Sequence, residues 1–230
     1  MTMKHTNTHR LGAAAAVLLA AFCSAPLAAH AADCASPATP AEKEVCADEE
    51  LHTLGEHMSR YVAGAMAAVH DGAQCFEVDQ QQWTEAVRDA CGGDVQCQTA
   101  EFRRRLAQLH ALQPGATALT GMDLPDDVPE LVTVVPPAPE APDESTGEPF
   151  EATGRLVWEQ EDVNNMGYAL RNDDGVHVIV LDMDLSASPT HDALRTAIEN
   201  EASATFRVIG TKSPEGGFAM NQCRFVWRVE

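Results

Sequence analysis

The sequence predicts an α+β protein of two domains: a disulfide-stapled helical hairpin or three-helix module, then a small OB-like β-barrel with one helix. Three patterns lead to this prediction. Apolar residues recur every three or four positions over residues 32–112, prolines and acidic residues crowd residues 113–149, and short alternating runs fill residues 150–230. With 230 residues and 45% hydrophobic residues, the chain can build a packed core.

Residues 1–31 have the pattern of a secretory signal peptide. Lys4 and Arg10 come before or at the start of an apolar, alanine-rich run over residues 11–27, which is followed by a small-residue cleavage pattern. We expect cleavage between Ala31 and Ala32, which makes the protein periplasmic or secreted. The run is shorter than the roughly 20 residues of a spanning helix, so no membrane span is expected in the mature form.

The charge balance restricts the class of partner. The chain has 15 Lys and Arg against 35 Asp and Glu, a net charge of −20. Loss of the signal peptide removes two basic residues and no acidic ones, which leaves −22. Such a charge repels nucleic acids and suits a cationic partner, so no nucleic-acid partner is expected.

The helical module is predicted from a capping box and an apolar stripe. Thr39-Pro40-Ala41-Glu42 combines a capping residue, a proline at the first helical position and a glutamate three residues after the cap. The stripe that follows predicts a helix to about Val69. Further helices are predicted over residues 78–91 and 95–112, separated by a glycine-containing turn.

The linker and the barrel differ sharply in composition. Between Pro114 and Pro149 there are eight prolines, eight acidic residues and no Lys or Arg, which predicts an extended spacer; an acidic arm that wraps a basic partner is the alternative. An Asn172 to Gly175 segment suits a hairpin turn. The order of three strands, a helix and two strands is that of an OB-like barrel. The strands are predicted over residues 154–161, 166–171, 176–184, 205–210 and 218–229, and the helix over 191–201.

Six cysteines remain after export, and an oxidising compartment favours structural disulfides. They are Cys34, Cys46, Cys75, Cys91, Cys97 and Cys223, and they allow 15 connectivities. Short separations suit Cys34 with Cys46 and Cys91 with Cys97. A bond between the remaining two is a hypothesis that would staple the barrel to the helices. Cys23 lies within the signal peptide and could mimic a lipoprotein acceptor, but Phe22 occupies the preceding position, where such sites need a small residue, and this disfavours lipidation.

No catalytic or cofactor motif accompanies these features. The sequence has no GxSxG elbow, phosphate-binding loop, HExxH or dinucleotide fingerprint, so we predict neither an enzyme nor a cofactor. His52 and Glu56 stand one helical turn apart, with His57 beside them, as metal ligands can. Because no further ligands are visible, the prediction is a solvated helix surface without a metal.

Residues 33–112 contain an ordered series of cysteines and other residues. It comprises Cys34, Glu42 to Cys46, Gln80 or Gln81 with Trp83, Arg88 to Cys91, Cys97, and Phe102 to Leu109. This series resembles the lysozyme inhibitor LprI-like N-terminal domain family. Two departures are present: Trp83 precedes Arg88 by five residues where the family more often has four, and Cys75 is additional.

The resemblance implies binding to a cationic, lysozyme-type cell-wall hydrolase. The alternative is an envelope structural or assembly protein without affinity for lysozyme; a third hypothesis is a hydrolase or saccharide-binding barrel over residues 150–230. Contact residues are not visible in the sequence. Trp83 and Arg88 are predicted to support the helices rather than to touch a partner.

Overall fold

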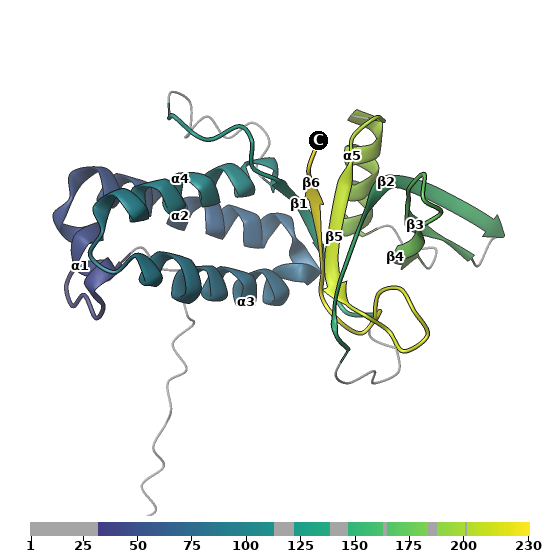
Figure 1. The fold of residues 1–230 in the computed structure, drawn as a ribbon, viewed down its shortest axis with the longest axis horizontal. Helices are drawn as coiled ribbons and strands as arrows, with labels where there is room; N and C mark the ends of the chain where they lie inside the picture. Colours follow the sequence, from purple (N-terminus) through teal and green to yellow (C-terminus); the bar gives the residue numbers. More distant parts are fainter. Residues whose placement is uncertain (1–31, 113–121, 139–146, 163–164, 184–187, 201) are drawn as a thin grey trace, which may run out of the picture.

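The fold is described from a computed structural model, over residues 32–112, 122–138, 147–162, 165–183, 188–200 and 202–230. Within these ranges the chain forms five α-helices and a six-stranded antiparallel sheet (Figure 1). Four helices gather at one end of the molecule, and the sheet with the fifth helix forms the other end. The mixed helix-and-sheet class is therefore confirmed.

The N-terminal helices pack around α2, which contacts α1, α3 and α4. The third predicted helix is confirmed, whereas the second begins at Ala73 rather than at Val78 because Cys75 and Phe76 are buried in the core. The elements are α1 (Pro40–Ala47), α2 (Glu49–Ala68), η1 (His70–Gly72), α3 (Ala73–Trp83), η2 (Thr84–Arg88), η3 (Asp89–Cys91), α4 (Val95–Leu109) and η4 (His110–Leu112).

The predicted capping box is present, but the single helix predicted after it is two helices. The backbone N–H of Glu42 donates to Thr39 Oγ1 at 3.1 Å, and the N–H of Thr39 donates to the Glu42 carboxylate at 3.1 Å. At Asp48 the backbone is extended, and its side chain accepts from the N–H of Leu51 at 2.9 Å. The Asp48 carboxylate therefore caps a new helix, which the apolar stripe alone could not reveal.

The sheet is open. Its strands are β1 (Glu130–Val135), β2 (Pro149–Asp162), β3 (Asn165–Arg171), β4 (His177–Met183), β5 (Phe206–Thr211) and β6 (Arg224–Arg228), in the order β1-β6-β5-β2-β3-β4. The edge strands β1 and β4 are not paired with each other, so the OB-like barrel is not confirmed. Strand β1, which the sequence analysis did not predict, pairs with the outer edge of β6 and forms one edge of the sheet.

Strand β1 lies within the segment predicted as a spacer. Leu131, Val134 and Val135 in this strand are fully buried. These six residues contain no proline and four Val or Leu residues, which the composition of the wider segment conceals. Part of residues 113–149 is thus a core strand, and residues 113–121 and 139–146 lie outside the described residues.

The predicted hairpin turn and C-terminal helix are confirmed. The N–H of Gly175 donates to the carbonyl of Asn172 at 3.2 Å, and Gly175 has a φ of +83°, which suits glycine. Helix α5 (Pro189–Asn200) packs against β1 and β2 and buries Leu194. Together with the inner residues of the sheet it encloses one hydrophobic cluster.

A second hydrophobic cluster joins the helices to the sheet. It contains the apolar stripe of α2 together with Leu131, Val134 and Trp227 of the sheet. A disulfide between Cys75 of α3 and Cys223, which precedes β6, crosses the same junction. The domain boundaries proposed from the sequence stay a prediction, but the two halves share a core. Among the described helices, none combines the length and apolar character that crossing a bilayer requires.

Candidate functional site

An acidic groove lies beside the start of α2. It has a volume of about 590 Å³ and is lined by Asp48, Glu49, Glu50, Thr53, Leu54, Arg103, Met122 and Asp123. We call it the α2 groove. Its four carboxylates and one guanidinium give a formal charge of −3, which suits a cationic side chain of a partner.

The carboxylates stand where the start of a helix stabilises negative charge. Asp48 is the N-cap of α2, and Glu49 and Glu50 lie in its first turn. The positive end of the helix dipole stabilises carboxylates at these positions by about 0.3–1 kcal/mol each. The local sequence therefore concentrates acidic side chains here for a structural reason as well.

Arg103, which lies on α4, also lines the groove and pairs with two of its carboxylates. Its Nη2 lies 2.6 Å from Glu50 Oε1, and its Nη1 lies 3.9 Å from Asp123 Oδ2. Glu50 is 55% exposed and Asp123 is 96% exposed, so these ion pairs stabilise by about 0–1 kcal/mol at most. A stronger cationic partner can replace Arg103 at small cost.

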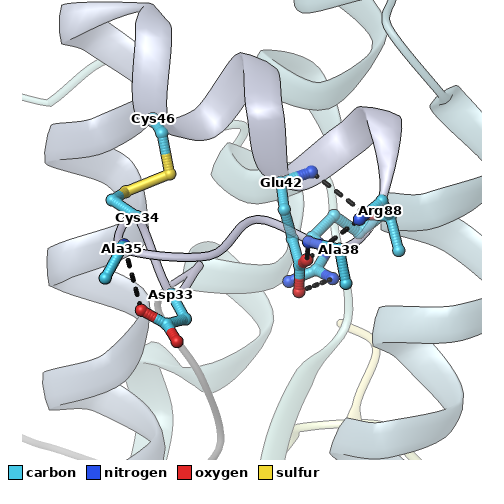
Figure 2. The surroundings of a disulfide bond; sticks show 8 residues. Asp33, Cys34, Ala35, Ala38, Glu42, Cys46 and Arg88 are labelled. Atoms are coloured by element: carbon cyan, nitrogen blue, oxygen red, sulfur yellow. Dashed lines mark hydrogen bonds and ion pairs between the residues drawn. A yellow bond between two sulfur atoms is a disulfide. The ribbon is translucent and has the colours of Figure 1, made fainter.

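A disulfide and a carboxylate hold the chain that precedes α1 (Figure 2). Cys34 is bonded to Cys46, with their Cα atoms 5.4 Å apart. Glu42 accepts from the N–H of Ala38 at 2.6 Å, and its other carboxylate oxygen lies 3.6 Å from Arg88 Nη2. Arg88 is 4% exposed, so this link ties the N-terminal segment to the second half of the helical bundle.

The turn before α4 is cross-linked in a similar way. Cys91 is bonded to Cys97, and the Asp94 carboxylate caps α4 by accepting from the N–H of Cys97 at 3.0 Å. The Gln98 side chain donates to the carbonyl of Gly92 at 2.7 Å. These contacts fix the start of the helix that supplies Arg103.

Arg105 of α4 lies in the interior of the helical bundle. It is 3% exposed, and it donates to Asp79 Oδ2 at 2.6 Å and to Gln80 Oε1 at 3.0 Å. Its guanidinium also lies 6.0 Å from the ring centroid of Trp83, which packs edge-on against Phe102. Trp83 is thus partly buried against the core of the bundle, and Arg88 is buried in it; that neither touches a partner stays a prediction.

The six predicted cysteines form three disulfides, and the pairs are those of the sequence hypothesis: Cys34 with Cys46, Cys91 with Cys97, and Cys75 with Cys223. Ala32 at the predicted cleavage point is 9% exposed. Ala31 and the rest of the predicted signal peptide lie outside the described residues.

His57 of α2 stands next to a cation. His57 Nδ1 lies 3.4 Å from the Arg60 guanidinium, and burial together with Arg60 lowers the pKa of His57, although Glu56 raises it. In the described part of the chain, no group of three His, Cys, Asp or Glu side chains is placed to hold a metal ion.

The groove was not identified from the sequence. The sequence analysis predicted one helix running through Asp48, so the acidic residues at the start of α2 gave no signal of a groove. Arg103 reaches it through the packing of α4 against α2, and Asp123 lies in the segment before β1. The ion pair between Arg103 and Glu50 joins residues 53 positions apart, so it depends on tertiary structure.

Comparison with known proteins finds relatives for part of the chain. It is 35% identical over 98 residues to Lipoprotein LprI of Mycobacterium bovis and, to the same extent, to Lipoprotein LprI of Mycobacterium tuberculosis. The match covers 41% of this chain and 48% of each relative, so the chain spans about half the length of the curated relatives it matches. No family model matches the chain, and no solved structure matches it. The resemblance to LprI is therefore confirmed for part of the chain.

Proposed function

We propose that this protein is an exported, lysozyme-inhibitor-like binding protein and not an enzyme. Its acidic surface binds a cationic lysozyme-type cell-wall hydrolase. The similarity to Lipoprotein LprI over 98 residues is the observation that carries the proposal. The family that the sequence resembles is named for lysozyme inhibition. The predicted signal peptide over residues 1–31 would deliver the protein to the periplasm or the medium.

Two physical features support this proposal. The mature charge of −22 would steer a cationic enzyme toward the protein and raise the association rate. Three disulfides suit an oxidising compartment. The α2 groove offers several carboxylates at the start of α2, and the Cys91–Cys97 disulfide lies at the start of α4, the helix that supplies Arg103.

The test is lysis of cell walls by lysozyme, followed by turbidity, with the mature protein present and its disulfides intact. We expect stoichiometric inhibition, and calorimetry should record binding that survives moderate salt. Absence of inhibition at a large molar excess would contradict the proposal. Recovery of an envelope partner without added lysozyme would then favour the structural or assembly role.

The groove is tested by a charge-matched pair of variants. Glu49→Gln with Glu50→Gln should weaken lysozyme binding about tenfold, which corresponds to about 1.4 kcal/mol. Glu56→Gln with Glu85→Gln removes the same charge from exposed positions of the helical half outside the groove. If both pairs weaken binding equally, net charge rather than the groove accounts for it.

A further inference from the structure

Arginines of three neighbouring strands lie in a row on the sheet. Arg155 of β2 is directly opposite Arg171 of β3, and Arg171 is opposite His177 of β4. Arg207 of β5 is opposite Thr153, two residues before Arg155. Residues opposite each other, or two apart in one strand, point to the same face of a sheet. We call Arg155, Arg171 and Arg207 the arginine row.

Two of the three arginines of the row are paired with glutamates. Arg171 Nε lies 2.6 Å from Glu159 Oε1, and Arg207 Nη1 lies 3.8 Å from Glu151 Oε1. Arg155 is exposed and takes part in none of the ion pairs of the described residues. Arg155 is therefore the guanidinium of the row that these ion pairs leave open to a ligand, although Asp173 and Asp174 follow Arg171 in the turn.

This arrangement is unfavourable for the sheet alone. Like charges directly opposite each other on neighbouring strands destabilise the pairing. Arg171 reaches toward Glu159, which the register places opposite Gly167, four residues from Arg171 along β3. The side chain therefore leans along the strand, away from Arg155. Arg171 is 60% exposed, whereas Glu159 is only 18% exposed and also pairs with His177 Nε2 at 2.9 Å. An incoming anion that draws Arg171 back would therefore leave Glu159 with His177 as its partner.

We propose that the arginine row binds a ligand with clustered oxyanions. A guanidinium matches a carboxylate or phosphate with two parallel hydrogen bonds. Because neighbouring strands lie about 4.8 Å apart, Arg155 and an Arg171 drawn back from Glu159 can both reach one ligand with adjacent anionic groups. The site is independent of the proposed function, because it lies on the sheet and repels a cationic enzyme.

The experiment measures binding of tripolyphosphate to the full mature protein by calorimetry at low salt. Arg155→Gln should weaken the affinity at least fivefold, whereas Arg104→Gln should leave it unchanged. Arg104 is a matched control because it is also exposed and takes part in no ion pair of the described residues. Citrate in place of tripolyphosphate distinguishes carboxylate from phosphate ligands, and stronger binding of either identifies the source of the oxyanions.

Two further readouts separate a binding site from a structural feature. Without ligand, Arg155→Gln should unfold at the same temperature as the wild type or higher, because the opposed charge is gone; a lower temperature would indicate a structural role. Asp173→Asn with Asp174→Asn, in the turn that follows Arg171, should strengthen tripolyphosphate binding. Equal affinity in the wild type and Arg155→Gln, or no binding by the wild type, would overturn the proposal. Lysozyme inhibition by Arg155→Gln should match the wild type in every case.

Discussion

The helical half, residues 32–112, and the sheet half, residues 122–230, bury their arginines in different surroundings. In the helical half Arg88 lies 2.7 Å from the Asp89 carboxylate, and Arg105 lies 2.6 Å from that of Asp79. Each buried guanidinium there has a carboxylate partner. The helical half thus keeps its buried charge neutral.

Arg224 of β6 has no such partner among the described residues. It is fully buried, and it donates to the carbonyls of Ala219 at 3.1 Å and Pro136 at 3.0 Å. Burial lowers the pKa of its guanidinium to about 10, although Asp182 raises it. The sheet half therefore uses a buried arginine to bind backbone, including the segment that follows β1.

The disulfides also differ between the two halves, in the sequence separation that they bridge. Cys34 with Cys46 and Cys91 with Cys97 close short segments within the helical half, whereas Cys75 with Cys223 spans 148 residues and joins the halves. Among the described residues, none of the disulfides lies within the sheet half. The comparison indicates that local contacts stabilise the helical half, while the sheet half depends on contacts distant in sequence.

The largest effect should come from the cross-link between the halves. Cys75→Ala with Cys223→Ala should lower the free energy of unfolding by about 5 kcal/mol, because the unfolded chain loses a very long loop constraint. Cys91→Ala with Cys97→Ala removes a six-residue separation and should cost about 2 kcal/mol. Urea denaturation measures both. Equal losses of unfolding free energy would show that the cross-link between the halves stabilises the protein no more than the local one.

The buried arginines give the next effect. Arg105→Met leaves Asp79 and Gln80 without their donor and should cost about 3 kcal/mol. Arg224→Met leaves carbonyl groups but no carboxylate and should cost about 1–2 kcal/mol. Urea denaturation of the two variants compares the halves with one substitution type. A larger loss of unfolding free energy for Arg224→Met than for Arg105→Met would contradict the expected difference between the two halves.

Tyr168 gives the sheet half a dependence on alkaline pH. Burial, with a smaller contribution from Asp192 and against Arg195, raises the pKa of Tyr168 to about 12. Between about pH 10 and 12 the unfolded chain ionises this phenol while the folded chain keeps its proton. The free energy of unfolding should therefore fall by up to about 2–3 kcal/mol over that window.

Tyr168→Phe is the control for this pH dependence. The variant should lose stability less steeply between pH 10 and 12, as measured by urea denaturation at each pH. Burial also raises the pKa of Tyr61, the tyrosine of the helical half, so an ultraviolet titration should record late ionisation of both phenols. A wild-type titration with both midpoints near 10 would contradict the expected burial.

The smallest effect tests the local determination of α1. Thr39→Ala removes the hydroxyl that caps the N–H of Glu42 and should cost about 1 kcal/mol. Thr53→Ala, at an exposed position inside α2, should change stability by only a few tenths of a kcal/mol because alanine favours a helix. Thermal unfolding of the two variants decides whether the cap matters.

Sequence patterns predicted most helices and five of the six strands of the described sheet. They failed where one residue competed with a periodic stripe, at Asp48, and where a short apolar run lay among prolines, at β1. For the α2 groove they showed neither the helix start at Asp48 nor the approach of Arg103. The arginine row was also invisible, because it depends on which strands are neighbours.

By itself, the sequence determined the start of α1, the extent of α4, and the turn from Asn172 to Gly175. Each depends on hydrogen bonds and packing between residues a few positions apart. Only the tertiary structure decided that β1 pairs with β6 and that Arg155 stands opposite Arg171. Those partners are separated along the chain, and their meeting depends on burial of a shared core rather than on local propensity.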